Sequence, residues 1–563
     1  MATPLSNGRT PLEPVWRFLR TERESVWIIL AHACGVGLLS LALPVAIQSL
    51  VNTVAFGSVL QPILVLTLVV IACMGASAIL KLMQTLAAEM LQRRIFVRFS
   101  LLIASRLPNL RSEAHRSVNV QETVNRFFDI FLVQKALAFL LLEGVGLVLQ
   151  AAIGLILLAF YHPFLLAFGG LLVASLVFVC FVLGSGAVKS AIEESSAKYQ
   201  MAAWLEEMAR IPRSLNSTDG NRQALDRADC MASLWLNARE GHFRKIFSQT
   251  LGTLGLQVLA SGILLGFGGW LVIRKELSLG QLVAAELIVT GVLYSISKMG
   301  KQFEAFYDVV AGLNKIEGIL DLPVESSDGR MIEDSEGAWS VSLKGVSLRD
   351  SDSSRRLDDI TIDIPSGSKV LIVGAGGSGK SLLAGLLFGS FRPDSGQVLL
   401  QGQDLRYLAP LAMRRRVKLV GELELIDGTV EENLLLGNHD AGLHDLERAL
   451  RSVRLDSTVS RLREGLMTRL NIRGAPLTYS QARKLMLARA VLGRPGLVIL
   501  DKNSDWLQSP VPGASTRELL RGFFQTLGDC TVIVLAEPDF ATDELMREFD
   551  LRLVLSEGRL SHA

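Results

Sequence analysis

Cysteine and histidine are scarce in this sequence. The chain has 563 residues but only five cysteines and seven histidines. The cysteines lie far apart and form no C-x-x-C pair: they are Cys34, Cys73, Cys180, Cys230 and Cys530. This spacing excludes a disulfide framework and the usual kind of zinc site. Metal catalysis through a cluster of protein ligands is therefore not expected.

Charge is also low, and it is nearly balanced. Charged residues make up 20% of the chain, hydrophobic residues make up 50%, and the formal net charge is +2. This composition excludes a disordered or collagen-like chain and argues against a purely soluble enzyme. The charge balance gives no reason to expect a nucleic-acid partner. The length predicts two or three compact units.

Long apolar runs are concentrated in the first half of the chain. Six of them approach the ~20 residues that a helix needs to cross a bilayer. They cover residues 26–51, 62–83, 136–161, 164–183, 251–273 and 282–296. We therefore expect a cytoplasmic N-terminal segment at 1–24 and then an all-α, multi-pass membrane domain of six helices at 25–320. Pro44 should kink the first helix, because proline cannot donate a backbone hydrogen bond.

Lysine and arginine are unevenly distributed among the connections between these runs. The long connection at 84–135 is rich in arginine and the one at 184–250 is rich in both, whereas those after the first and third runs contain neither. Positive charge favours the cytoplasmic side, so both chain ends are predicted to be cytoplasmic. Helical spacing of apolar residues predicts that the long connections continue the membrane helices into water. Glu143 and Glu286 lie within apolar runs, and each is a group that contacts cargo, a protonated or helix-pairing carboxyl, or a carboxyl near the lipid headgroups.

The chain becomes more polar after residue 320. A polar stretch with Gly and Ser at 321–338 indicates a linker to a second domain at 339–563. In that domain, strand-like runs alternate with helical ones; the runs cover 341–346, 360–364, 369–373, 497–500 and 532–536. This order predicts an α/β domain with a largely parallel sheet, and the G-x-x-x-x-G-K-S loop at 374–381 indicates that it is of the P-loop NTPase kind.

The sharpest motif directly follows the expected strand at 369–373. Residues 374–381 read GAGGSGKS and match the pattern G-x-x-x-x-G-K-[ST] in full. We predict that this loop and the next residue bind the phosphates of ATP, through Gly374, Ala375, Gly376, Gly377, Ser378, Gly379, Lys380, Ser381 and Leu382. Lys380 should reach the β- and γ-phosphates, and Ser381 should coordinate Mg²⁺. A glycine-rich turn without a ligand is the plainer alternative.

Asp501 ends the strand-like run at 497–500, where a carboxylate could hold Mg²⁺ through water. With these motifs the chain resembles an ATP-binding cassette (ABC) exporter half-transporter, in which six membrane spans precede one nucleotide-binding domain. Residues 477–500 are similar to the family's signature-to-Walker-B segment, and 427–433 are similar to the segment after its Q-loop. The resemblance covers nearly all of residues 20–560.

The resemblance implies a dimer of two half-transporters that encloses two ATP molecules with Mg²⁺. Each site takes the P-loop of one half and the signature of the other. It also implies an integral protein of a bacterial inner membrane, surrounded by lipids. With only the predicted segment at 1–24 before the first span, no N-terminal peptidase domain is expected.

Several positions depart from the family pattern. The signature Leu-Ser-Gly-Gly-Gln is Leu477-Thr478-Tyr479-Ser480-Gln481 here, so both of its glycines are lost. Other residues stand at four further family positions: Lys502 for the catalytic glutamate, Gly421 for the Q-loop glutamine, Glu537 for the switch histidine and Asp350 for the adenine-stacking aromatic. A charged ammonium cannot accept a proton from attacking water, so hydrolysis by this chain alone is expected to be weak or absent. Lys502 and Glu537 either form an ion pair across the site or changed independently.

The sequence therefore favours the catalytically degenerate half of a heteromeric exporter, with hydrolysis supplied by a partner half. One alternative is a non-hydrolysing regulatory or scaffold membrane protein of ABC-transporter shape. Another is an active homodimeric exporter that uses Glu422 or Glu424 as its base. The resemblance leaves the cargo open among lipids, lipopeptides, peptides, drugs and secreted proteins.

Overall fold

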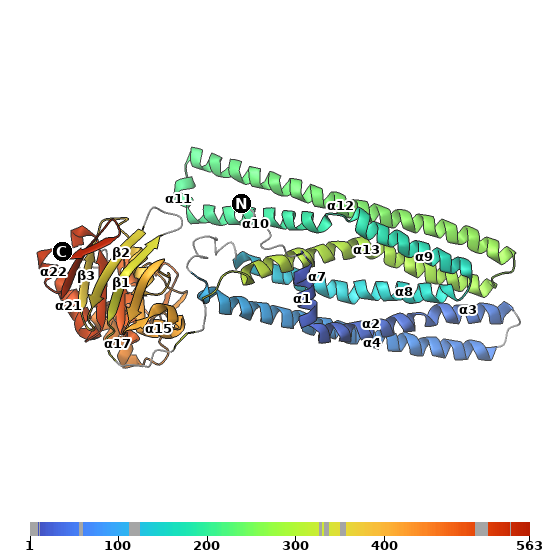
Figure 1. Cartoon of the computed structure of the whole chain (residues 1–563). Helices are drawn as coiled ribbons and strands as arrows, with labels where there is room; N and C mark the ends of the chain where they lie inside the picture. The colour runs from blue at the N-terminus through green and yellow to red at the C-terminus, as the bar shows by residue number, and fades with distance from the viewer. Residues whose placement is uncertain are drawn as a thin grey trace. The chain divides into compact units, whose positions relative to one another are not determined.

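The computed structural model describes residues 10, 12–55, 60–111, 124–325, 329–330, 337–349, 356–501, 516–540 and 542–562. The chain divides into two compact units, Met1–Pro323 and Val324–Ala563. The first unit consists of long helices, and the second combines strands with shorter helices (Figure 1).

Long helices run side by side through the first unit (Figure 1). The α-helices are α1 (Glu13–Thr21), α2 (Arg23–Ser40), α3 (Ala42–Ala55), α4 (Leu60–Arg106), α7 (Asp129–Phe139), α8 (Val145–Ala159), α9 (Pro163–Phe178), α10 (Ala187–Arg210), α11 (Pro212–Leu215), α12 (Thr218–Ile273) and α13 (Leu279–Leu320). Short 3₁₀ or π-helical turns adjoin them: η2 (Leu107–Asn109), η3 (Arg126–Phe128), η4 (Leu140–Gly144) and η5 (Val179–Leu183).

Six helical segments among the described residues are long and apolar enough to cross a membrane. They are Arg23–Asn52, Ile63–Asn109, Arg126–Ala159, Pro163–Leu183, Thr218–Ile273 and Gly280–Leu320. The six apolar runs of the sequence fall on these segments, so the predicted all-α, six-helix domain is confirmed. The 47 residues of α4 and the 56 of α12 also confirm that the long connections continue the membrane helices.

Local sequence signals explain where these helices break and begin. The first span is interrupted at Leu41, three residues before Pro44, where the proline ring removes a helical hydrogen bond. His162 ends the turn before α9, and its ring accepts a hydrogen bond from the Phe164 N–H at 3.0 Å. Ser278 and Gln281 form a capping box that starts α13.

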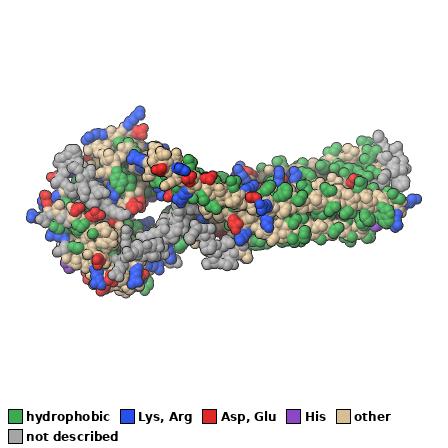
Figure 2. All heavy atoms as spheres, turned by 90° about the horizontal axis from the view of Figure 1, so that it is seen from above, with side chains coloured by type: hydrophobic (Ala, Val, Ile, Leu, Met, Phe, Trp, Pro, Cys, Tyr) green, Lys and Arg blue, Asp and Glu red, His purple; other side chains and the backbone are tan. Residues whose placement is uncertain are grey.

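Hydrophobic side chains cover much of the surface of the first unit. Figure 2 shows them over the half that holds α3, α8 and α9, while Lys, Arg, Asp and Glu gather toward the other half. Large exposed side chains in this band include Leu64, Leu68, Phe160, Leu166 and Ile273. An apolar band of this kind suits a hydrocarbon surrounding and is too large for a water-exposed surface.

A six-stranded sheet lies at the centre of the second unit, in the order β12-β11-β3-β10-β9-β6. Its strands are β3 (Lys369–Val373), β6 (Val417–Val420), β9 (Leu497–Leu500), β10 (Thr531–Ala536), β11 (Leu551–Ser556) and β12 (Arg559–His562). Every neighbouring pair is parallel except β11 with β12. The predicted largely parallel sheet is confirmed.

A second, antiparallel sheet has the order β2-β1-β4-β5. It consists of β1 (Val341–Arg349), β2 (Arg356–Ile364), β4 (Ser395–Leu400) and β5 (Gln403–Asp404). The sequence located β1 and β2, but it did not indicate that they belong to a separate sheet. A short pair, β7 (Gly428–Thr429) and β8 (Arg469–Leu470), completes the strands of the described chain.

Two apolar cores lie on opposite faces of the parallel sheet. Alternate residues of each buried strand belong to different cores: Val370 and Ile372 pack toward β1 and α14, whereas Leu371 packs toward α19. Burial on both faces explains why β3, β9 and β10 read as continuous apolar runs. The helices and short turns of this unit are α14 (Lys380–Leu387), η6 (Leu405–Tyr407), α15 (Pro410–Arg416), α16 (Val430–Leu435), α17 (Leu443–Ser452), α18 (Asp456–Arg461), η7 (Gly465–Met467), α19 (Tyr479–Leu492), α21 (Thr516–Leu527), η8 (Pro538–Phe540) and α22 (Asp543–Met546).

Described parts of the expected linker at 321–338 contact the second unit. Glu325 accepts two hydrogen bonds from Arg414, at 2.5 and 2.8 Å. The Arg330 N–H donates to the Tyr407 carbonyl at 2.7 Å, and the Ala409 N–H donates to the Arg330 carbonyl at 3.1 Å. These two points of the segment are therefore held against α15 and the turn before it.

Candidate nucleotide-binding site

Four positions singled out in the sequence follow neighbouring strands of the parallel sheet. Gly374 follows β3, Glu537 follows β10, Asp501 follows β9 and Gly421 follows β6. Parallel pairing in the order β3-β10-β9-β6 brings these four positions to the same edge. Ligands of such sheets bind beyond the carboxyl ends of the strands, so this edge is the candidate site.

The glycine-rich loop turns sharply between β3 and α14. Gly377 and Gly379 have φ values of +85° and +107°, a region that favours glycine. A Cβ atom at Gly374 would lie 2.6 Å from the carbonyl oxygen of Leu555. The backbone is exposed at Ala375 and Gly376. Backbone N–H groups in such a turn, together with the start of a helix, form a cradle for phosphate.

Lys380 begins α14 and turns back over this loop. Its Nζ donates to the carbonyl oxygens of Gly374, at 2.5 Å, and Ala375, at 3.0 Å. Burial lowers the pKa of Lys380, and the nearby carboxylates of Glu537 and Asp501 partly oppose that shift. The ammonium group therefore lies above the cradle, where it can meet a phosphate oxygen.

The residues expected to hold Mg²⁺ fit that ion. Asp501 is 7% exposed, and its Oδ1 has no hydrogen-bond partner among the described residues. A buried polar atom of this kind calls for a ligand. Ser381 is exposed at the start of α14 and offers a hydroxyl. No cluster of three His, Cys, Asp or Glu side chains occurs within the described ranges.

The signature-like residues begin helix α19. Thr478 is its N-cap: its hydroxyl accepts from the Gln481 N–H at 3.3 Å, and the Gln481 side chain accepts from the Thr478 N–H at 2.9 Å. Two of the four residues are therefore used to start the helix. Tyr479 is 55% exposed, and Ser480 is half-buried. Side chains thus stand where the family has two glycines.

Arg483 connects this helix to the strand end at Gly421, and sequence reasoning missed it. Its guanidinium donates to the Gly421 carbonyl at 2.7 Å and to the Tyr479 hydroxyl at 3.1 Å. The residue is only 5% exposed. One signal was available in the sequence: Arg483 and Lys484 directly precede the apolar run Leu485–Ala488 of the helix, and a buried arginine requires acceptors.

The charged positions around the site are only partly described. Glu537 is exposed at the end of β10 and lies within electrostatic range of Lys380. Lys502 and Asp350 lie outside the described residues, so the suggested Lys502–Glu537 pair is not described. Glu422 and Glu424, weighed as alternative bases, are exposed in the segment after Gly421.

The two acidic residues noted within apolar runs lie in the helical unit. Glu143 is exposed in the π-helical turn η4. Glu286 is exposed on α13, where it borders a cavity of about 100 Å³ together with Ser261 and Thr290. The structure therefore does not place either carboxyl inside the packed core of the unit.

Comparisons with known proteins agree with this arrangement. Residues 357–504 match the family model described as "ABC transporter". The exotoxin translocation ATP-binding protein PaxB of Pasteurella aerogenes is 27% identical over 324 residues, which are 56% of this chain and 44% of that protein. The alpha-hemolysin translocation ATP-binding protein HlyB of Escherichia coli is 26% identical over 340 residues, covering 59% and 47% of the two chains. The chain thus spans about half the length of these relatives.

A solved structure with a similar fold covers almost the whole chain. It is described as a bacterial Atm1-family ABC exporter with ATP bound, and it matches with a TM-score of 0.82 at 18% sequence identity, covering 97% of this chain and 95% of the other. The match extends over both the helical unit and the α/β unit. With six apolar helices fused to one ABC-type nucleotide-binding unit, the chain has the architecture of an ABC exporter half-transporter.

Proposed function

We propose that this chain is the ATP-binding, catalytically degenerate half of a heteromeric ABC exporter. One observation carries the proposal: an intact phosphate loop shares its sheet edge with strand ends that have lost their catalytic side chains. Gly421 offers no side chain, and Glu537 replaces a histidine with an anion. In the sequence, Lys502 directly follows Asp501 and stands at the position of the family's catalytic glutamate. Such an edge supports binding without efficient hydrolysis.

The roles of the chain's own residues follow from their chemistry. Backbone N–H groups of 374–380 and the Lys380 ammonium would hold the nucleotide phosphates. Ser381 and Asp501 would hold Mg²⁺, which neutralises phosphate charge when bound. Water needs a base to become a nucleophile, and a protonated lysine at 502 cannot serve as one. ATP would therefore remain bound and largely uncleaved at this loop.

A partner half-transporter would supply the hydrolysis. ABC transporters work as dimers, and in a mixed dimer the partner's complete loop would meet the Thr478–Gln481 segment of this chain. In a homodimer, both sites would lack the base. We therefore favour a heterodimer, embedded in lipid as a multi-pass protein of a bacterial inner membrane with both ends in the cytoplasm.

Relatives suggest a class of cargo. PaxB and HlyB are named as translocation ATP-binding proteins for an exotoxin and for alpha-hemolysin. By this similarity we propose a protein or peptide cargo over a lipid or drug. The alignments include less than half of each relative, so this part of the proposal stands on similarity alone.

The test separates binding of ATP from turnover. The full chain, purified alone into nanodiscs, should bind ATP with Mg²⁺ in a calorimetric titration and release phosphate no faster than a blank. Lys380→Ala should lower ATP affinity at least ten-fold, because it removes the ammonium over the phosphate cradle. Lys344→Ala, which changes an exposed lysine on β1, should leave ATP affinity unchanged.

Each other outcome selects a different function. Robust phosphate release that Lys380→Ala abolishes would establish an active homodimer and overturn the degenerate assignment. Absence of ATP binding at millimolar concentration would instead favour the scaffold reading.

A further inference from the structure

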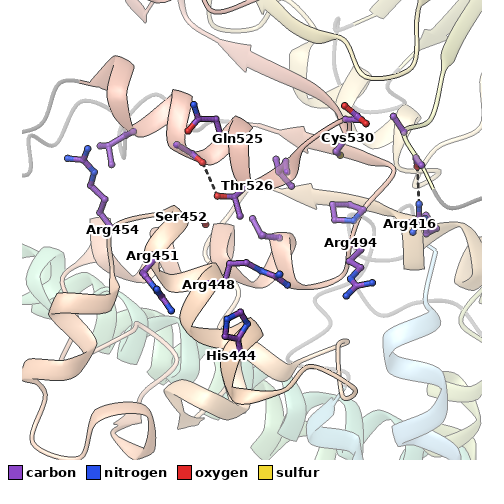
Figure 3. Close-up of a pocket in the computed structure, with 18 of the residues that line it drawn as sticks. Arg416, His444, Arg448, Arg451, Ser452, Arg454, Arg494, Gln525, Thr526 and Cys530 are labelled. Carbon is purple, nitrogen blue, oxygen red and sulfur yellow. Dashed lines mark hydrogen bonds between the residues drawn. The ribbon is translucent and has the colours of Figure 1, made fainter.

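The α/β unit contains a large cavity that is remote from the phosphate loop. It has a volume of about 970 Å³ and lies between α17, α21, the turn after α19 and the segment that leads into β10 (Figure 3). Pro495 and Cys530 belong to its lining, just before β9 and β10 begin. The cavity is therefore at the amino ends of the strands, whereas Gly374 follows a carboxyl end. The six residues of β10, at about 3.3 Å each, separate the two edges by ~20 Å.

Arginine dominates the charged side chains of this cavity. Five arginines line it: Arg416 at the end of α15, Arg448 and Arg451 on α17, Arg454 just after α17, and Arg494 just after α19. His444 adds a group that can become cationic. The acidic lining residues are Glu518 and Asp529. The cavity therefore carries a clear excess of positive charge, although the whole chain is nearly neutral.

The ion pairs of these arginines leave much of their donor capacity available. Arg448 contacts Asp445 at 2.5 Å, Arg451 contacts Glu447 at 3.2 Å, and these pairs lie within one helix. Arg454 contacts Glu518 at 3.3 Å. Exposed pairs of this kind contribute little stability and exchange readily, and each guanidinium has five N–H donors.

Arg494 differs from the paired arginines. It is exposed, and the described residues give its side chain neither a hydrogen bond nor an ion pair. Its guanidinium can therefore meet an anion without first giving up a partner.

Backbone conformation supplies an independent observation. Arg454 and Arg494 have φ values of +53° and +42°, and each follows the end of a helix. Glycine is the usual residue at this position, because a side chain is disfavoured in the left-handed region. Two arginines of one cavity are thus held in a conformation that glycine would adopt more readily. Strained residues of this kind cluster at ligand-binding sites.

We propose that this cavity is a second anion site, which binds a free small molecule carrying several phosphate groups. The planar guanidinium of arginine can bind two phosphate oxygens through parallel N–H donors. Several arginines in one cavity therefore suit a ligand with clustered phosphate groups. None of the described lining residues is Phe, Tyr or Trp, so they offer no aromatic ring on which a nucleobase or single-stranded RNA could stack. The volume suits a compact ligand.

Inorganic tripolyphosphate is the probe that tests this site. The full chain is studied in nanodiscs of phosphatidylcholine alone, whose headgroups carry no net negative charge. Lys380→Ala is present throughout to weaken binding at the phosphate loop. Titration calorimetry should detect tripolyphosphate binding in this background, and orthophosphate should bind at least ten-fold more weakly because it engages fewer arginines.

Charge-removing substitutions identify the location of binding. The triple variant Arg448→Gln, Arg451→Gln, Arg494→Gln should weaken tripolyphosphate binding at least ten-fold. The matched triple Arg461→Gln, Arg463→Gln, Arg473→Gln removes equal charge from exposed arginines outside the cavity and should change binding less than two-fold. Equal loss in both triples, or no binding in the Lys380→Ala background, would overturn the proposal.

A single substitution separates ligand binding from folding. Arg494→Gly suits the left-handed backbone, so the melting temperature should stay the same or rise, while tripolyphosphate binding falls several-fold. A lower melting temperature with unchanged binding would show that Arg494 supports the fold and not a ligand. ATP binding by the chain with Lys380 intact is measured separately, so failure here leaves the proposed function untouched.

Discussion

In the proposed site, the ammonium of Lys380 would exchange backbone carbonyl oxygens for phosphate oxygens when a nucleotide binds. It now donates to the carbonyls of Gly374 and Ala375, and the carboxylates of Glu537 and Asp501 are near enough to favour its charged form. Burial has the larger effect and lowers its pKa. The residue therefore holds a charge that is easier to remove than that of a free lysine.

This lowered pKa predicts how nucleotide binding depends on pH. Only the protonated amine attracts phosphate, so ATP affinity should decline as pH rises through the Lys380 pKa, which is below the ordinary value of about 10.4. Calorimetric titrations between pH 7 and pH 10 measure the decline. Lys380→Arg is the control, since a guanidinium stays charged and any binding it retains should be flat over this range. The same decline in Lys380→Arg would assign the titration to another group.

Glu537 carries a carboxylate at the sheet edge where we propose that phosphate binds. Replacing it with the neutral isostere, Glu537→Gln, should strengthen ATP binding by about two- to five-fold, a modest effect because the side chain is exposed. Glu464→Gln, at an exposed glutamate away from the strand ends, is the matched control. Unchanged or weaker binding in Glu537→Gln would mean that its carboxylate does not face the phosphates.

At the scale of elements, α19 and the end of β6 are connected by one side chain. Arg483 satisfies the Gly421 carbonyl and the Tyr479 hydroxyl from a buried position. The helix that carries the signature-like residues is thereby fixed to the strand end at the Q-loop position. A shift of the strand end at Gly421 should therefore also displace the start of α19, and a shift of α19 should displace that strand end.

Arg483→Met keeps the length of the side chain and removes its donors. We expect the α/β unit to lose about 2 kcal/mol, because a buried carbonyl loses its partner, although the methionine still packs. The melting temperature of the full chain, followed by intrinsic fluorescence, should fall by several degrees. Arg473→Met, at an exposed arginine six residues before α19, should leave it unchanged. Equal melting temperatures of Arg483→Met and Arg473→Met would show that water replaces the guanidinium as the partner of the Gly421 carbonyl.

Helices and strands could be predicted from the sequence where a single local pattern determines them. β3 and β9 begin and end at the predicted residues, because strands buried on both faces are unbroken apolar runs bounded by polar turns. The six membrane helices follow from length and hydropathy. The antiparallel sheet was not predictable, since strand pairing depends on partners far away in sequence. Arg483 and Gly421 likewise are 62 residues apart, and no periodicity connects them.

At the scale of the whole molecule, the loss of hydrolysis that we propose has more than one cause. The base position, the strand ends at Gly421 and Glu537, and the signature at Tyr479 and Ser480 have all changed. Restoring one group should leave the others limiting, because effects of catalytic residues that act together are strongly non-additive. ATP hydrolysis should therefore return only as several of these positions are restored together.

The restoration series begins with Gly421→Gln, Lys502→Glu and Glu537→His in one chain. A side chain at Gly421 is sterically acceptable, because a Cβ atom there has no described atom within 4 Å. A restored base is worth about 10²–10⁴-fold in rate, but this triple variant should stay near the blank while Tyr479 and Ser480 still face a bound γ-phosphate. Phosphate release from the full chain in nanodiscs measures each step.

Adding Tyr479→Gly and Ser480→Gly should raise phosphate release at least ten-fold above the triple variant, because glycine lets the backbone approach the phosphate. The two glycine substitutions alone are the matched control and should show no turnover, since the base is still absent. The loss of the Tyr479 hydroxyl that Arg483 contacts should lower the melting temperature slightly in both. If Lys502→Glu alone restores full turnover, the signature of this chain is competent as it stands, and the chain then requires its partner only for a base.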